Sequence, residues 1–197
     1  MKTFVEQLKE SLEDYLDPFL DEGVYIDESR LKPGYLYREE LASAICHSIC
    51  MIVVYTPKYI DDEKHPYCLL EYRAMERIEE KRIELLGGRI NNAGMIIPII
   101  FRGEIKDMPS NIKDRIQCCD FSKFTTASPH IKEDPEYIAK IETIVKIIHD
   151  YYRVFKENDI DPCCDCHSFS LLSKDDVKPW EIKSNKPKIP FPGRGAK

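Results

Sequence analysis

Two uninterrupted apolar runs constrain the fold of this chain more than any other feature. Residues 49–55 read ICMIVVY and residues 95–101 read MIIPIIF, and both runs are rich in branched side chains. Apolar residues on both faces are typical of strands that are covered on both sides, as in a parallel sheet. Pro98 has no amide hydrogen to donate, so we expect the second of these strands at an edge or a bulge.

Helical patterns alternate with the apolar runs along the chain. Apolar residues at helical spacing predict helices over residues 3–17, 38–47, 67–86 and 135–156. Residues 24–26 and 116–120 are shorter strand candidates. This order predicts an α/β fold with an open parallel sheet and helices on both faces.

Charge and composition exclude several classes of protein. The chain has 197 residues, of which 43% are apolar, and 29 Lys and Arg against 35 Asp and Glu give a net charge of −6. An acidic balance argues against nonspecific binding to nucleic acid. No apolar run approaches the roughly 20 residues of a membrane helix, and the charged N-terminus does not resemble a secretory signal. We therefore expect a cytoplasmic protein without membrane or direct nucleic-acid partners.

The composition changes after Asp159, where prolines recur and the last residues become basic. We predict a folded domain over residues 1–159 and a Pro- and Cys-containing extension over residues 160–197. The basic end of this extension is interpreted as a solvated tail.

Eight cysteines raise the question of disulfides or a metal site. The size and charge of the chain favour reduced thiols over a disulfide framework. The one metal-like pattern is Cys163, Cys164, Cys166 and His167, but zinc sites normally use two separated pairs of ligands. The Cys118–Cys119 pair could complete it only if the extension folds back. We favour reduced cysteines and predict no metal.

A candidate site follows from the topology of a parallel sheet. Ligands bind beyond the carboxyl ends of the strands in such sheets. The helix that follows residues 49–55 carries Glu71 about one turn from its start, and Tyr67 lies four residues earlier on the same helix face. A carboxylate at this position is expected to face the crevice.

Short motifs occur in a fixed order over about residues 3–155. They are Val24-Tyr25-Ile26-Asp27, Leu31-Lys32-Pro33-Gly34, Ala44-Ile45 with Ser48, Tyr55-Thr56-Pro57-Lys58-Tyr59, Tyr67-Cys68-Leu69-Leu70-Glu71, Ile97-Pro98-Ile99 and Asp120-Phe121-Ser122. Together they resemble the TIR (Toll/interleukin-1 receptor) domain family, especially its bacterial members that cleave NAD. Tyr67 stands where the family's W-C-x-x-E motif often has Trp. The resemblance implies a flavodoxin-like TIR fold.

The resemblance also implies an activity, cleavage of the nicotinamide–ribose bond of NAD+, with NAD+ as substrate and no cofactor. Glu71 takes the position of the catalytic glutamate, and a carboxylate there would stabilise the cationic ribose of the transition state. Water would give ADP-ribose, and attack by the adenine end would give a cyclic product; both outcomes stay open. Substrate contacts are expected from Tyr67, Asp27, Ser48 and Tyr59.

Family resemblance further suggests a role in antiphage defence or immune signalling. Self-association of TIR domains is expected, with the "BB" loop of Leu31, Lys32, Pro33 and Gly34 as a gate or a subunit contact, and a partner effector or sensor protein is possible. Two other functions stay open. One is a non-enzymatic module that only assembles with other TIR domains, and the other is a different nucleoside-processing enzyme of similar topology.

One feature departs from the family pattern. TIR domains begin with a strand similar to F-I-S-Y-S, whereas this chain begins in the helix that follows it. The missing strand would lie between residues 24–26 and 49–55 and leave a gap of about 10 Å. Three explanations are considered: a longer native chain, which we favour; residues 167–176 filling the slot; or a sheet that closes up in a catalytically inactive domain.

Overall fold

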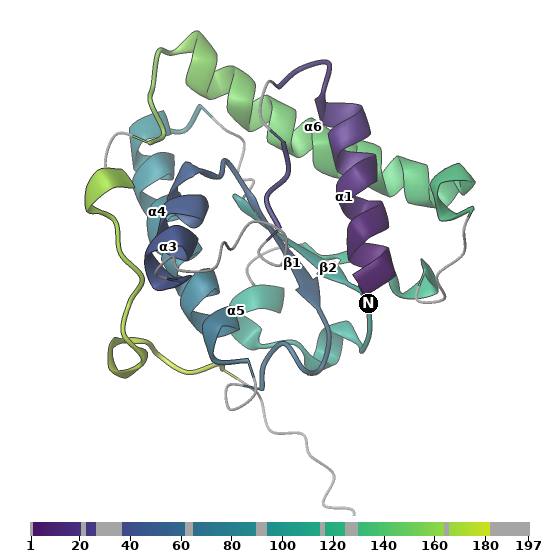
Figure 1. The fold of residues 1–197 in the computed structure, drawn as a ribbon, viewed down its shortest axis with the longest axis horizontal. Coiled ribbons are helices and arrows are strands. Elements are labelled where there is room, and N and C mark those ends of the chain that lie inside the picture. Colours follow the sequence, from purple (N-terminus) through teal and green to yellow (C-terminus); the bar gives the residue numbers. More distant parts are fainter. Residues whose placement is uncertain are drawn as a thin grey trace, which may run out of the picture.

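A parallel sheet lies between two layers of helices (Figure 1). The computed structural model describes residues 2–20, 23–26, 37–61, 65–89, 94–114, 117–124, 130–163 and 166–181. Within these residues the sheet has three strands, β1 (Met51–Tyr55), β2 (Ile96–Ile100) and β3 (Cys119–Asp120), in the order β1-β2-β3. Both pairings are parallel, which confirms the predicted α/β class.

The helices match the predicted ranges closely. The long ones are α1 (Lys2–Leu16), α3 (Tyr37–His47), α4 (Pro66–Leu86) and α6 (Pro135–Glu157). The short ones are α5 (Ser110–Lys113), η1 (Ile105–Asp107), η2 (Ser122–Phe124), η3 (Ile131–Glu133), η4 (Cys166–Ser168) and η5 (Lys174–Asp176). None of the helices in the described part of the chain has the length and apolar character needed to cross a membrane.

Local sequence explains where the two longest helices begin and end. Asp134 caps α6, because its side chain accepts hydrogen bonds from the amides of Glu136 and Tyr137 at 2.8 and 3.1 Å. Proline occupies the first position of both α4 and α6, where its missing amide hydrogen costs nothing. Gly87 ends α4 with a φ of 54°, a left-handed conformation that glycine adopts without strain.

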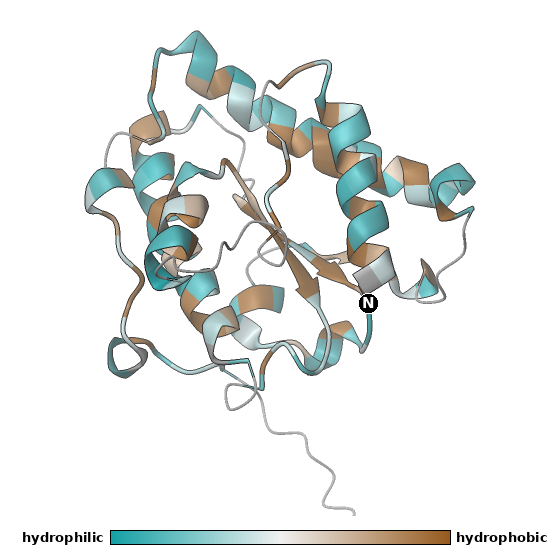
Figure 2. Cartoon of the chain, viewed as in Figure 1, coloured by the Kyte–Doolittle hydropathy of each residue, from teal (hydrophilic) through white to brown (hydrophobic). Residues whose placement is uncertain are grey.

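β1 and β2 contact helices on both faces of the sheet, which is why these two strands are apolar (Figure 2). Val53 and Tyr55 of β1 pack with α3 and α4, whereas Ile52 and Val54 of the same strand face α1 and α6. On the α1 side, the ring of Phe4 stacks on Phe101 with centroids 4.3 Å apart.

The prediction of an edge or bulge position for Pro98 is wrong, because β2 is the central strand and Pro98 lies opposite Val53. The amide of Phe101 donates to Tyr55 of β1. Backbone groups alternate in direction along a strand, so the nitrogen of Pro98 faces the other way, toward β3. The two-residue β3 pairs only with Ile99 and Ile100. No ladder hydrogen bond is therefore lost at Pro98.

The prediction of a strand at residues 24–26 is also wrong. These residues have no regular secondary structure, and among the described residues β1 pairs only with β2. A cavity of about 1100 Å³, lined by residues 24–26, α1, α3 and the outer edge of β1, lies here. Because no described strand lies beside them, residues 24–26 have no ladder to join.

Two of the three explanations for the absent first strand do not hold. The sheet does not close up, since residues 24–26 do not pair with β1. Residues 167–176 do not fill the slot either, because they form η4 and η5 and run on to Trp180, which packs with Tyr59 and Tyr72. The explanation by a longer native chain stays a prediction.

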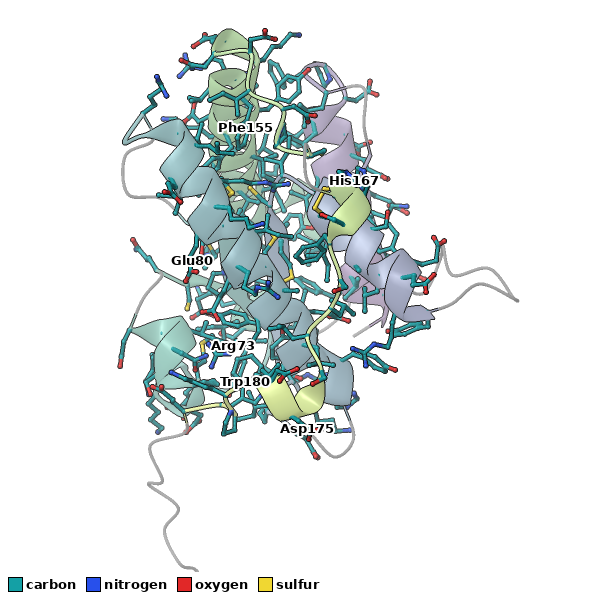
Figure 3. All side chains as sticks on the ribbon, turned by 90° about the vertical axis from the view of Figure 1, so that its left-hand side faces the viewer. Arg73, Glu80, Phe155, His167, Asp175 and Trp180 are labelled. Carbon is teal, nitrogen blue, oxygen red and sulfur yellow. A yellow bond between two sulfur atoms is a disulfide. The ribbon has the colours of Figure 1, made fainter. Side chains whose placement is uncertain are left out.

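The described part of the predicted extension folds back over α3 and α4 (Figure 3). Cys166, Leu171 and Trp180 are buried in the same core cluster as the two helices. The ring of Trp180 lies 5.2 Å from that of Tyr72, and the carbonyl of Glu181 accepts a hydrogen bond from the amide of Ser110 at 2.8 Å. These residues thus add to the core of the domain.

This packing brings together two cysteines that are far apart in the sequence. Cys46, at the end of α3, and Cys166, in η4, form a disulfide with their Cα atoms 5.5 Å apart. The prediction that all cysteines are reduced is therefore wrong for this pair. Their proximity depends on the course of the C-terminal segment, which no local pattern reveals.

Candidate functional site

The cavity beside β1 is lined by both apolar and polar side chains. Leucines of α1 and apolar residues of β1 form much of the apolar lining. The polar lining residues include Glu40, Ser43, His47 and Ser48 from α3 and the adjoining turn, and Glu71 from α4. The cavity lies along the edge of β1 with which no described strand pairs, in the place that the family pattern gives to a further strand, and Glu71 is the residue of the Tyr67–Glu71 motif that lines it.

Glu71 reaches this cavity because of where α4 begins. The chain leaves the sheet at Tyr55, the carboxyl end of β1, and enters α4 at Pro66. Glu71 then lies in the second turn, half-buried, and lines the cavity beneath α3. The cavity runs along β1, because residues 48–52 and 54 line it, and it is not confined to the carboxyl edge of the sheet where a crevice was expected.

Tyr67 lies one turn before Glu71 and is half-buried. Its ring packs edge-on against the ring of Tyr37 at the start of α3, with centroids 4.7 Å apart and planes at 64°. Tyr67 does not line the cavity itself. An aromatic pair shared by α3 and α4 thus lies about one helical turn from Glu71.

Tyr59 is half-buried and is not among the residues that line the cavity. Its hydroxyl donates to the carbonyl of Cys68 at 3.4 Å, and its ring lies 5.8 Å from that of Trp180. Burial raises the pKa of Tyr59 well above its ordinary value, and the nearby Cys68 and Glu71 raise it further. Tyr59 therefore stays protonated and holds the start of α4 rather than facing the cavity.

Ser48 lines the cavity, but its hydroxyl and its carbonyl have protein partners. Its hydroxyl donates to the carbonyl of Ala44 at 2.7 Å, and its own carbonyl accepts from the guanidinium of Arg82 at 2.7 Å. Its hydroxyl oxygen can still accept a hydrogen bond from a ligand.

The remaining predicted site residues are Asp27, Leu31, Lys32, Pro33 and Gly34, and all of them lie outside the described residues. The structure brings Glu71 and Ser48 to one cavity, whereas Tyr67 and Tyr59 are not among the residues that line it.

Two buried charged residues of α4, Glu79 and Arg82, were not predicted from the sequence. Glu79 is 0% exposed and accepts a hydrogen bond from the amide of Met95 at 2.6 Å, just before β2. Arg82 is 2% exposed and donates to several backbone carbonyls. Glu79 lies four residues after Met75 and Arg82 four residues after Ile78, so both fall on the apolar stripe of the helix. A charged residue on such a stripe is the sequence signal that could have identified them.

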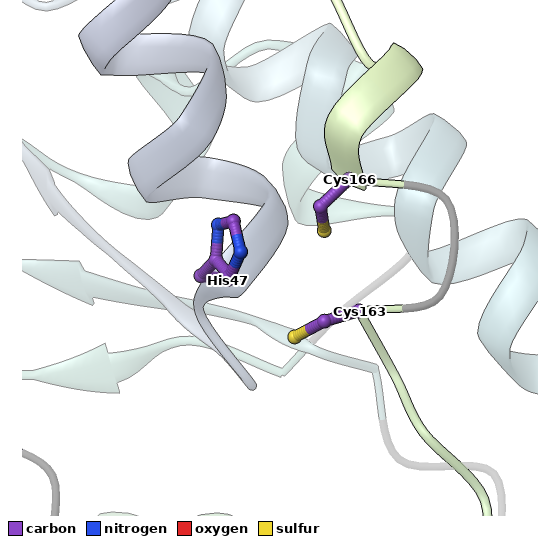
Figure 4. Close-up of side chains that lie close together, drawn as sticks. All are labelled: His47, Cys163 and Cys166. Carbon is purple, nitrogen blue, oxygen red and sulfur yellow. The ribbon is translucent and has the colours of Figure 1, made fainter.

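A cluster of possible metal ligands lies at the C-terminal end of α3. The ligand atoms of His47, Cys163 and Cys166 are all within 4.8 Å of one another (Figure 4). His167, which the sequence pattern placed with the cysteines, is exposed and does not belong to this group.

The fold and the cavity define a class: an α/β domain with a short parallel sheet and a half-buried glutamate beyond its first described strand. A family model of the TIR domain matches residues 1–132, two thirds of the chain, and the chain therefore belongs to the TIR domain family. This family includes NADases. No curated protein and no solved structure matches the chain significantly.

Proposed function

We propose that this TIR domain is an NAD+ nucleosidase of the bacterial type, which cleaves the bond between nicotinamide and ribose. The observation that carries the proposal is the position of Glu71, which is half-buried in the second turn of α4 and lines the cavity beside β1. A carboxylate in such a place is partly shielded from water, so it interacts more strongly with a developing positive charge.

The chemistry needs little from the protein beyond this carboxylate. Nicotinamide leaves NAD+ as a neutral molecule and takes the bonding electrons with it, so no general acid is required. The ribose then carries the positive charge of an oxocarbenium ion, which Glu71 would stabilise. Water adds to the ribose carbon and loses a proton to give ADP-ribose, or a nitrogen of the adenine adds instead to give a cyclic product.

The neighbouring residues have supporting roles in this proposal. Tyr67, with Tyr37, offers an aromatic surface near the carboxylate. Ser48 and Asp27 are proposed to contact the substrate, and Tyr59 is proposed to act by holding the start of α4 through Cys68.

Self-association is the second part of the proposal. The loop of Leu31, Lys32, Pro33 and Gly34 would contact another TIR domain, and two subunits would build the complete site. A role in antiphage defence or immune signalling, together with an effector or sensor partner, is consistent with an activity that depends on assembly.

A purely non-enzymatic interaction module is the rival function. The outer edge of β1 favours it, because no described strand pairs with this edge and strand edges are common docking surfaces. The experiment that separates the two is incubation of the purified chain with NAD+ over a range of protein concentrations and with a crowding agent. Free nicotinamide and an ADP-ribosyl product, identified by mass, support the enzyme. NAD+ that stays intact under all conditions supports the interaction module.

A further inference from the structure

The strongest unexplained feature of the molecule is the group of sulfur and nitrogen atoms where the C-terminal segment crosses α3. Figure 4 shows the side chains of His47, Cys163 and Cys166 pointing toward a common space, with ligand atoms within 4.8 Å of one another. The sulfur of Cys46 is adjacent too, because it is bonded to Cys166. Three sulfur atoms and one imidazole therefore lie close together, contributed by two segments that are remote in sequence.

We propose that Cys46, His47, Cys163 and Cys166 bind one Zn²⁺ ion when the thiols are reduced. Three cysteines and one histidine are an established ligand set of structural zinc sites. The set consists of two separated pairs, Cys46-His47 on α3 and Cys163-x-x-Cys166 on the C-terminal segment. Two separated pairs are the usual arrangement of zinc ligands, and the contiguous pattern at residues 163–167 lacks it.

Hydrogen bonding prepares His47 for this role. Its Nδ1 lies 2.7 Å from the carbonyl oxygen of Ser43. A carbonyl can only accept, so Nδ1 carries the hydrogen and the lone pair of the neutral ring is on Nε2. A backbone carbonyl that orients a histidine in this way is a common partner of zinc ligands.

The turn that carries the other pair is also fixed by hydrogen bonds. The side chain of Asp161 accepts from the amide of Cys163 at 2.8 Å, and the amide of Cys166 donates to the carbonyl of Cys163 at 3.0 Å. These bonds order the backbone at both cysteines, and their sulfurs lie near His47 of α3.

Arg82 links the two halves of the cluster and supplies the balancing charge. Its guanidinium donates to the carbonyl of Cys46 at 2.6 Å and to that of Pro162, next to Cys163, at 3.1 Å. Three thiolates and a neutral histidine around Zn²⁺ leave a net charge of −1. A buried cation beside the site offsets this charge, which would be costly to bury alone.

The zinc site and the disulfide exclude each other, since both use the sulfurs of Cys46 and Cys166. A reductant must first supply two electrons and two protons to the disulfide. The three thiols then release three protons as their sulfurs bind Zn²⁺. In this form the metal, instead of the disulfide, fastens the C-terminal segment to α3. The inference is independent of the NAD-cleaving activity.

The test is titration of the full chain with Co²⁺, after reduction with a phosphine in the absence of oxygen. Tetrahedral thiolate coordination predicts sulfur-to-cobalt charge-transfer and intense visible absorption bands, saturation at one equivalent, and loss of the bands when Zn²⁺ is added. A Zn²⁺-dependent rise in the Tm of the reduced protein is expected as well. A reduced protein that gives no such bands overturns the proposal and leaves the cluster as a disulfide only.

Variants show whether the bands come from this cluster. Cys163→Ser and His47→Ala each remove one ligand without touching the disulfide cysteines, and each is expected to weaken Co²⁺ binding about tenfold or more and to change the spectrum. Cys119→Ser is the matched control, because Cys119 lies in β3 outside the cluster. Retention of the wild-type spectrum and affinity in both ligand variants contradicts the assignment, provided that circular dichroism shows a native fold.

Discussion

The guanidinium of Arg82 donates a hydrogen bond to the carbonyl oxygen of Cys46 at 2.6 Å, and this contact joins the C-terminal part of α4 to the end of α3. The same side chain reaches the carbonyls of Ser48 at 2.7 Å and Pro162 at 3.1 Å. The carbonyls of Cys46 and Ser48, at and just after the end of α3, lack the amide donor that another helical turn would provide. The buried guanidinium thus provides hydrogen-bond donors for the carbonyls of the turn that leads into β1. It also holds the start of the C-terminal segment through the carbonyl of Pro162.

Replacing Arg82 by Met is expected to lower the free energy of unfolding by about 3 kcal/mol or more, because several buried carbonyls lose their donor at once. Arg82→Lys keeps the charge but not the planar fork, so we expect an intermediate loss. Urea unfolding measures both effects. Arg77→Met, at an exposed position of the same helix, is the control. Equal stabilities of the Arg82 and Arg77 variants would contradict this account.

The cysteines near the sheet are expected to react slowly with alkylating agents. Burial raises the pKa of Cys50 from an ordinary value of 9.0 to about 12 and that of Cys118 to about 11. Only thiolates react, so at pH values below 9 the reactive fraction falls about a thousandfold for Cys50 and about a hundredfold for Cys118. Mass spectrometry after iodoacetamide treatment compares each thiol in the native and the urea-unfolded chain. Similar rates in the two states would refute the prediction.

Buried phenols predict a loss of stability at alkaline pH. The hydroxyl of Tyr55 donates to the carbonyl of Asp107 at 3.0 Å, and burial raises the pKa of Tyr55 from 10.0 to about 12, with a smaller contribution from the charge of Asp107. Because the folded chain prefers the protonated phenol, this stabilisation is complete below pH 10 and is lost as the pH rises toward 12.

Urea unfolding at several pH values tests the contribution of Tyr55. Tyr55→Phe should cost about 1 kcal/mol at neutral pH through the lost hydrogen bond. Its stability should then fall less steeply than that of the wild type above pH 10. Parallel pH profiles for the two proteins would show that Tyr55 does not titrate as proposed.

The proposed assembly loop gives a prediction for Gly34. A bulky residue at this turn position is expected to weaken self-association and NAD+ cleavage together, because a glycine in a turn often needs a positive φ. The unfolding transition should change little. Sedimentation at increasing protein concentration measures the assembly, and a variant that assembles and cleaves NAD+ as the wild type does would exclude the loop from this role.

The layers of the fold could be predicted from the sequence because hydrophobic periodicity reports burial directly. Apolar runs on both faces identified β1 and β2, and the stripes of α1 and α6 identified the helices that cover one side. The place of Glu71 followed from a topological rule that needs only the order of strand and helix.

The errors share a physical cause, since each concerns contacts between segments far apart in sequence. Pro98 is tolerated at the centre of the sheet only because β3 is so short. Residues 24–26 have strand-like side chains but no described strand beside them. The meeting of His47 with Cys163 depends on how the C-terminal segment packs across α3, and no local pattern encodes that path.

The central claim, that Glu71 makes this TIR domain an NAD+ nucleosidase, is tested most directly by nicotinamide release from NAD+ in wild type, Glu71→Gln and Glu80→Gln. Glu80 is an exposed glutamate of the same helix, so its variant controls for the general effect of losing a charge on α4 (Figure 3). We predict release by the wild type and by Glu80→Gln, and a rate lower by about a hundredfold or more in a folded Glu71→Gln. Equal rates for Glu71→Gln and the wild type, or no release by the wild type at any concentration, would contradict the claim.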